Sequence, residues 1–243
     1  MSRRTLPTIL LTVALAAASC GDDNTAATST TSFSAPKDAG TAQSDDISTP
    51  EYLAFRAQPV ACGGEAPESA TEMTFAAPDD LGLGGTFAAI ITTSCGAITI
   101  ELDADNAPNT VNSFIFLAEQ GYFNGTVSHR IVPGFVIQIG DPTATGRGGP
   151  GYRIPDELPE EGFVYTRGTV AMANAGANTG GSQFFLVLAD APLPPAFSAF
   201  GVVTSGFDVM NEIAAVPTTA RSAGLEPSSP LETVYIESVE IQH

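Results

Sequence analysis

A short apolar hairpin that carries one permanent charge is the feature that most constrains this chain. From Ser128 to Gly140 the sequence reads S-H-R-I-V-P-G-F-V-I-Q-I-G. A Pro-Gly dipeptide, which marks a turn, separates two β-rich runs, Ser128–Val132 and Phe135–Ile139. Neighbouring side chains on a strand point to opposite faces, so Arg130 and His129 lie on opposite sides of the hairpin. Arg130 is therefore a fixed cation in an apolar setting. Taken alone, it either pairs with a surface carboxylate or serves a binding site.

The remaining pattern predicts a mainly β domain with two helices. Strands are expected at 87–93, 97–102, 169–173, 183–188 and 233–242, and helices at about 109–120 and 207–216. Asn109 or Thr110 is a candidate cap for the first helix, and Gly121 ends it. Many short strands with two helices suit a small closed barrel, which leaves no free edge to aggregate. Side chains fill the interior of such a barrel, so a binding site must lie on its outer surface.

Three further blocks occur in a fixed order around the hairpin. They read N-A-P-N-T-V-N-S-F at 106–114, M-A-N-A-G with G-S-Q-F-F at 172–185, and F-G-V-V at 200–203. Together with H-R-I-V-P-G-F-V-I-Q they make residues 87–242 similar to the cyclophilins. This resemblance implies a closed eight-stranded antiparallel barrel with a helix over each end. It also implies peptidyl-prolyl cis–trans isomerase activity, in which an X-Pro bond is rotated without any bond being cut.

The resemblance also assigns the site residues. Arg130 matches the catalytic arginine, with Gln138 as its catalytic partner. The substrate-binding residues are expected to be Phe135, Val136, Ala173, Asn174, Gln183, Phe185, Leu193 and Phe197. Val136 stands where many members carry Met, and Phe197 where they carry His. For Phe184 we expect ordinary core packing, and His129 is interpreted as a structural rather than a catalytic residue.

A Gly-rich loop, 141–151, follows the hairpin and would border the groove. A phosphate-binding function for this loop is disfavoured, because its glycines neither open a helix nor precede a Gly-Lys-Ser/Thr.

The amino-terminal segment has the features of an exported protein. Residues 1–19 have the basic start and apolar middle of a signal peptide. The ending L-A-A-A-S-C-G resembles a bacterial lipobox, in which Cys20 would be lipidated; otherwise Cys20 is an incidental thiol behind an ordinary signal. Residues 20–50 are mostly small and polar and predict a disordered tether. Residues 51–86 form an N-terminal extension, and residues 87–243 form the isomerase domain. The expected location is the extracytoplasmic face of the cell membrane.

Cysteine and histidine usage bounds the site chemistry. Cys62 and Cys95 are an even pair in an exported chain, and a disulfide is the economical interpretation. The alternative is two buried free thiols. Only His129 and His243 offer imidazole, and there is no Cys-x-x-Cys spacing, so we expect no metal and no cofactor.

The net charge of the chain limits the kinds of partner it can bind. The chain has 243 residues, with 27 Asp+Glu against 9 Lys+Arg and a formal net charge of −18. Such a surface repels phosphate backbones, so nucleic-acid binding is not expected. The expected partners are proline-containing client segments, and the membrane through a lipid anchor; a monomer is the working expectation. Two competing hypotheses are a proline-peptide-binding module or chaperone with little turnover, and a hydrolase. The hydrolase would need a nucleophile–base pair, and Ser128 and His129 face opposite ways.

Overall fold

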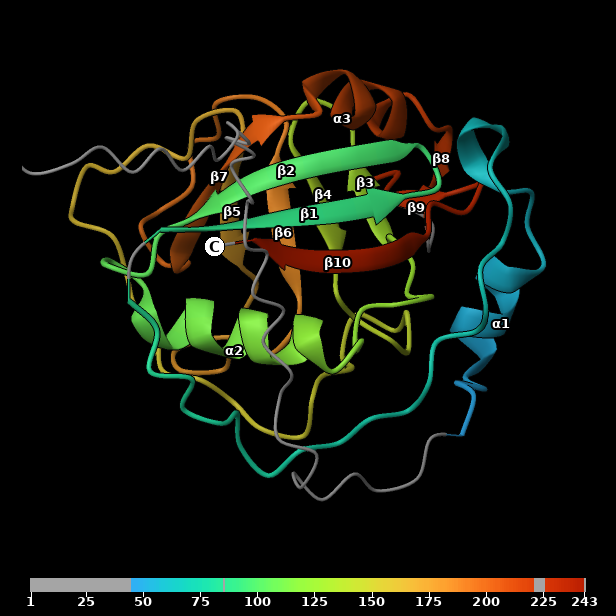
Figure 1. Cartoon of the computed structure of the whole chain (residues 1–243). Coiled ribbons are helices and arrows are strands. Elements are labelled where there is room, and N and C mark those ends of the chain that lie inside the picture. Colours follow the sequence, from blue (N-terminus) through green and yellow to red (C-terminus); the bar gives the residue numbers. More distant parts are fainter. Residues whose placement is uncertain (1–44, 85, 221–225, 243) are drawn as a thin grey trace, which may run out of the picture. The chain divides into compact units, whose positions relative to one another are not determined.

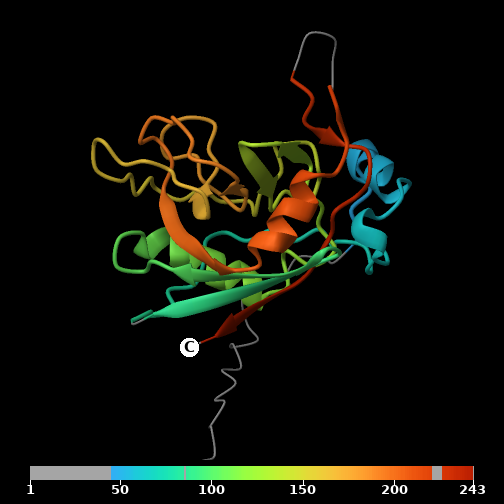
Figure 2. The same cartoon turned by 90° about the horizontal axis from the view of Figure 1, so that it is seen from above.

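The computed structural model describes residues 45–84, 86–220 and 226–242 (Figures 1 and 2). The predicted signal peptide, Cys20 and most of the predicted tether lie outside these residues. The helices are α1 (Pro50–Arg56), α2 (Pro108–Glu119) and α3 (Phe207–Ala214), with a 3-10 turn η1 (Ala61–Gly63). The strands are β1 (Phe87–Thr93), β2 (Gly96–Leu102), β3 (Arg130–Val132), β4 (Val136–Ile139), β5 (Thr169–Met172), β6 (Phe184–Val187), β7 (Ala199–Ser205), β8 (Thr218–Thr219), β9 (Ser229–Pro230) and β10 (Ile236–Gln242).

Eight of these strands form one antiparallel sheet, in the order β10-β1-β2-β7-β5-β6-β4-β3. This confirms the predicted eight-stranded, mainly β fold. The predicted full closure needs correction, because β10 and β3 stand at the two ends of that order. An isolated bridge between Val127 and Tyr235 joins the ends, flanked by a backbone hydrogen bond from Ser128 to Val234 (2.9 Å). The sheet is therefore a curled half-barrel whose edges meet over a few residues. β3 itself does not pair with β10, because the amide of Ile131 donates to the carbonyl of Ser228, next to β9 (2.8 Å).

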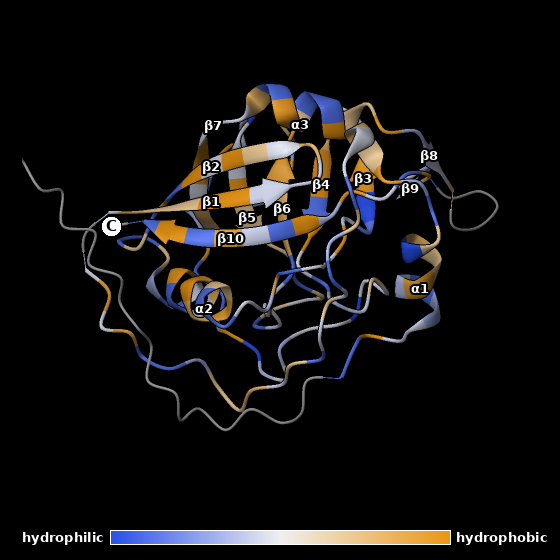
Figure 3. Cartoon of the chain, turned by 45° about the vertical axis from the view of Figure 1, so that its right-hand side comes forward, coloured by the Kyte–Doolittle hydropathy of each residue, from blue (hydrophilic) through white to orange (hydrophobic). Residues whose placement is uncertain are grey.

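Strand alternation sends one side of each long strand into a common core. In β1, every second residue from Phe87 to Thr93 is buried, and Figure 3 shows hydrophobic and hydrophilic residues alternating along β10. Aromatic rings fill the interior: Phe184 packs edge-on against Phe114 at 5.4 Å between centroids and against Phe123 at 5.8 Å. The expectation that Phe184 is a core residue is thus confirmed.

Helices α2 and α3 lie on opposite sides of the curled sheet (Figure 1). α2 begins at Pro108, one residue before the expected caps, and the N-cap position is Ala107, which offers no side-chain bond. Its amides are satisfied from elsewhere, because the carboxylate of Glu157 accepts hydrogen bonds from the backbone amides of Asn109 and Thr110, each at 2.8 Å. Proline suits the first turn of a helix, and a carboxylate is favourable at its positive end.

The N-terminal extension is folded against the sheet edge. α1, which the sequence did not predict, buries Tyr52 and Phe55. The hydroxyl of Tyr52 donates to the carbonyl of Gly125 (2.9 Å) and accepts from the amide of Ala70 (2.7 Å). A helix this short buries too few side chains for its periodicity to stand out in the sequence.

The predicted disulfide is present between Cys62 and Cys95, with a sequence separation of 33. It joins η1 to the turn between β1 and β2, so it fastens the extension to the first hairpin of the domain. Of the two interpretations that the sequence allowed, the structure contains the disulfide.

The last residues of the predicted tether, 45–50, are the part of it that the structure describes. Asp46 forms a bridge with Thr71, and Ile47 is buried. The predicted disordered tether therefore does not include residues 45–50, which belong to the folded part of the chain. Among the described residues, no helix has the length and apolar composition needed to cross a bilayer.

Candidate active site

The central hairpin brings the predicted catalytic arginine next to an aromatic ring. Arg130 opens β3, and its guanidinium carbon lies 5.9 Å from the centre of the Phe135 ring. The strand register pairs Arg130 with Gln138, and Gln138 in turn with Phe185 of β6. Residues directly opposite each other in antiparallel strands present their side chains on the same face. The cation, the amide and the second ring therefore form one row across the outer surface of the sheet.

An apolar cluster on this outer face is separate from the barrel core. It contains all the predicted apolar binding residues, Phe135, Val136, Ala173, Phe185, Leu193 and Phe197. The ring of Phe197 packs edge-on against that of Phe185, with centroids 5.4 Å apart, and lies 6.3 Å from Tyr165. The neighbours of these residues along the strands, such as Ile137 beside Val136, point into the core instead.

A chain of side-chain amides extends the row toward the Gly-rich loop. Gln138 donates through Nε2 to Oε1 of Gln183 (2.9 Å), and Gln183 donates through its own Nε2 to the carbonyl of Gly148 (2.9 Å). These contacts fix which way both amides point. They also connect the strands of the site to the loop, as the resemblance led us to expect for a loop that borders the groove.

A groove of about 530 Å³ lies beside this chain. Both glutamines line it, together with the loop residues 146–153 and with Ala173 and Asn174. The Asn174 side chain donates to the carbonyl of Ala196 (2.8 Å), so it ties the two segments that flank the apolar cluster. The predicted substrate-binding residues and Gln138 thus lie in the groove or in the apolar cluster, and Arg130 lies beside Phe135 of that cluster.

Asp141 is a residue of this site that the sequence did not reveal. Its carboxylate is fully buried and accepts hydrogen bonds from the amides of Thr143 (2.8 Å), Gly146 (2.6 Å) and Gly148 (3.2 Å). The sequence does place a lone acidic residue at the start of a Gly-rich loop, where many backbone amides need acceptors. That pattern could have indicated a carboxylate that anchors the loop. The carboxylate shapes the loop that carries the acceptor of Gln183.

Two further polar residues lie near the groove. His129 is buried, and its assignment as a structural residue stays a prediction. Tyr152 lines the groove and shares a hydrogen bond with Ser113 (2.8 Å). Burial raises the pKa of Tyr152 to about 12, so its phenol is neutral at physiological pH. The described residues contain no group of three or more His, Cys, Asp or Glu placed to hold a metal ion.

Comparison with known proteins gives a consistent result over the same segment. Residues 87–241 match the family model described as cyclophilin type peptidyl-prolyl cis-trans isomerase/CLD. The chain is 40% identical over 162 residues to a probable peptidyl-prolyl cis-trans isomerase B of Mycobacterium tuberculosis, a match that covers 60% of this chain and 52% of the relative. It thus spans about half the length of that relative. It is 41% identical over 148 residues to peptidyl-prolyl cis-trans isomerase ppi1 of Schizosaccharomyces pombe, covering 59% of this chain and 96% of the relative.

Solved structures agree with this. A cyclophilin type isomerase of Cryptosporidium parvum superposes with a TM-score of 0.59 at 31% identity, over 65% of this chain and 99% of its own. The same protein determined in the presence of the dipeptide Ala-Pro gives a TM-score of 0.58 at 32% identity, over 64% and 99%.

Proposed function

Because this chain belongs to the cyclophilin-type family of peptidyl-prolyl cis–trans isomerases, we propose that it accelerates rotation about X-Pro peptide bonds in client proteins. The barrier to that rotation is about 18–20 kcal/mol, because amide resonance must be broken. Uncatalysed, the rotation takes tens to hundreds of seconds. An enzyme lowers the barrier by binding the twisted amide better than either planar form.

Arg130 supplies that preference in the proposed mechanism. When resonance is lost, the proline nitrogen regains a lone pair and becomes a hydrogen-bond acceptor. A guanidinium next to this nitrogen donates to the twisted state and not to the planar states. The observation that carries the proposal is the row of Arg130, Gln138 and Phe185 across the outer face, which sets a cation beside an apolar cluster. The strand register places Arg130 beside Gln138 before the substrate binds, so little reorganisation is needed.

The rest of the site would hold the substrate. The proline ring is assigned to the apolar cluster, against Phe135, Val136, Phe185, Leu193 and Phe197. The amide of Ala173 already donates to the carbonyl of Gln183 (2.8 Å). We therefore assign the Ala173 carbonyl and the Asn174 amide to the peptide backbone, with Gln138 and Gln183 completing the polar side of the groove.

The test is a protease-coupled assay on a short peptide with one X-Pro bond. Replacing Arg130 with Ala should lower kcat/KM by about 10²–10³-fold, the usual cost of removing one preorganised donor. Arg130→Lys should recover only part of the activity, because an ammonium lacks the planar fork. Arg167→Ala is the matched control, since this guanidinium also lies over a ring, that of Phe207 at 5.5 Å, on another part of the molecule. It should leave the rate unchanged.

The same assay separates the enzyme from a proline-binding module. A wild-type chain that binds the peptide but leaves the rate at the uncatalysed level would establish the module. Equal rates for wild type and Arg130→Ala would remove Arg130 from the mechanism.

We also propose that the mature protein works outside the cytoplasm, held at the membrane through a lipid on Cys20. The basic and apolar start of the chain and its lipobox-like ending support this. The disulfide supports it as well, because disulfides persist in oxidising compartments. Mass spectrometry of the mature amino terminus should find a diacylated Cys20 as the first residue, and Cys20→Ser should release the protein from the membrane fraction. An unmodified, differently cleaved terminus would contradict the anchor.

A further inference from the structure

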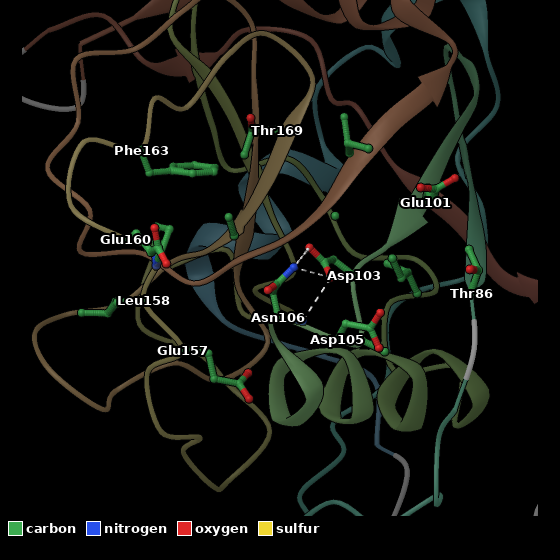
Figure 4. Close-up of a pocket in the computed structure, with 16 residues that line it drawn as sticks. Thr86, Glu101, Asp103, Asp105, Asn106, Glu157, Leu158, Glu160, Phe163 and Thr169 are labelled. Carbon is green, nitrogen blue, oxygen red and sulfur yellow. Dashed lines mark hydrogen bonds between the residues drawn. The ribbon is translucent and has the colours of Figure 1, made fainter.

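A second cavity, of about 760 Å³, lies outside the groove described above. It is formed by the end of β2 and the connection 103–106 that follows it, by β7, by the start of β5 and by the loop 157–163. In Figure 4, Glu160 and Phe163 stand on one side of the hollow and Glu101 and Thr86 on the other, with Asp105 between them. Neither the isomerase mechanism nor the strand pairing accounts for this hollow.

The cavity is lined by carboxylates without basic side chains. The acidic residues are Glu101, Asp103, Asp105, Glu157 and Glu160, and no Lys, Arg or His is among the described residues that line it. Two of them have structural tasks, because Asp103 accepts from Asn106 (2.8 Å) and Glu157 caps α2. The side chains of Glu101, Asp105 and Glu160 make no hydrogen bond or ion pair with the described part of the chain. No direct partner within the described residues therefore neutralises their charges.

Apolar side chains share the same hollow and remain in contact with solvent. Leu158 is 51% exposed, Val202 44% and Phe163 38%. A site that combines exposed hydrophobic surface with uncompensated negative charge is complementary to a segment that alternates apolar and basic residues. A metal ion would contact only the carboxylates and leave the apolar side chains exposed. A small anion would be repelled by the carboxylates.

The cavity adjoins the proposed isomerase site. The ring of Phe163 lies 5.0 Å from that of Tyr165, Tyr165 lies 6.3 Å from Phe197, and Phe197 packs on Phe185 at 5.4 Å. Ala199 lines the cavity and also packs against the apolar cluster. In the sheet order, β5 alone separates β6 from β7, which puts these strands roughly 10 Å apart. An extended peptide crosses that distance with about three residues.

We propose that this cavity is a second subsite for the client chain, which binds basic and apolar residues about three to five positions away from the isomerised proline. The inference rests on the proposed isomerase function, because the proline in the groove sets which part of the client reaches the cavity. It makes the enzyme select among X-Pro bonds by their flanking sequence. Long clients with Lys or Arg near the proline would be held at two places at once, which raises the local concentration of the second contact.

Two peptides test the selectivity. Both carry a central Ala-Pro and a Trp, with arms of about four residues on each side; one has arms of alternating Leu and Lys, the other of alternating Leu and Glu. The chain contains no Trp, so fluorescence anisotropy of the peptide reports binding without background. The wild type should bind the basic peptide about tenfold more tightly than the acidic one at low salt.

Local charge is separated from net charge by two matched triple variants. Glu101→Gln, Asp105→Asn and Glu160→Gln neutralise the cavity, while Glu65→Gln, Glu72→Gln and Glu237→Gln remove the same charge from exposed positions elsewhere. The cavity variant should weaken binding of the basic peptide about tenfold at low salt and about twofold at high salt, where charges are screened. The control should change it less than about twofold. Leu158→Ser should weaken both long peptides.

Neither triple variant should alter isomerisation of a tetrapeptide, which is too short to reach the cavity. Equal losses in the two triple variants, or equal affinity of the wild type for the two peptides, would overturn the subsite. A wild type that leaves tetrapeptide isomerisation at the uncatalysed rate would instead refute the proposed function, while the anisotropy data would still decide whether the cavity binds basic chains.

Discussion

Arg130 owes its surroundings to contacts that are far apart in the sequence. Strand alternation alone brings it to the outer face with Gln138. The orientation of Gln138 is then fixed by Gln183, and that of Gln183 by the carbonyl of Gly148. The loop that presents this carbonyl is held in turn by the buried Asp141. A residue that never touches the substrate therefore helps to set the geometry of the row.

Replacing Asp141 with Ala should show this dependence. The amides of Thr143, Gly146 and Gly148 would lose their acceptor in a largely buried place, so the free energy of unfolding should fall by at least about 2 kcal/mol. Urea denaturation measures this loss. Because the loop lines the groove, KM for a short Pro peptide should also rise more than kcat falls.

Asp79→Ala, at an exposed carboxylate that makes no hydrogen bond within the described residues, is the control and should leave both quantities unchanged. Unchanged amide hydrogen exchange at Gly146 and Gly148 in Asp141→Ala would contradict the proposed anchoring.

The residues that the sequence could identify are those whose role depends on near neighbours. Arg130, Phe135 and Gln138 share one hairpin, and their relative placement follows from strand periodicity. Asp141 and Glu157 could not be identified, because their partners are set by tertiary packing: Glu157 caps a helix 48 residues away from it in the chain. No local pattern records such a contact.

Element by element, the sequence predicts best where the pattern is long. The strands at β1, β2 and β10 and the helix α2 were expected close to their observed ranges. The prediction of full closure was wrong because the outer edge of β3 bonds Ser228 and not β10, a tertiary contact that no local pattern records. The short helix α1 was missed because it is held by the contacts of Tyr52 with Gly125 and Ala70 rather than by its own sequence.

At the scale of elements, the disulfide should carry much of the extension's stability. Replacing Cys62 and Cys95 together with Ala opens a loop with a sequence separation of 33. In the chain-entropy model this costs about 3–4 kcal/mol. The expected result is a lower urea midpoint for the double variant, with tetrapeptide isomerisation retained, because neither cysteine lines the groove.

Reduction of the wild type should reproduce the loss of stability and should not affect the double variant. A double variant as stable as the oxidised wild type would show that noncovalent packing of the extension is sufficient.

Across the whole molecule, acidity and burial together determine the response to alkaline pH. Burial raises the pKa of Tyr152 to about 12 and also raises those of Tyr122, Tyr165 and Tyr235. In the unfolded chain these phenols ionise near pH 10. Between about pH 10 and 12 the unfolded state therefore binds fewer protons than the folded state, and the free energy of unfolding falls as the pH rises. Below pH 10 both states are protonated, and these groups contribute no pH dependence.

Urea denaturation from pH 8 upward should therefore show constant stability from these groups until about pH 10 and a steep decline above it. Tyr152→Phe should make the decline shallower, because one of the phenols that ionises only on unfolding is gone, although it also loses the bond to Ser113. Ionised tyrosines also add negative charge to a chain whose net charge is already −18. Self-repulsion favours expansion, so this added charge lowers the free energy of unfolding further. High salt should weaken that second contribution and leave the tyrosine-dependent slope in place. A decline that vanishes in high salt would assign the alkaline response to surface charge alone and would contradict the role of the buried phenols.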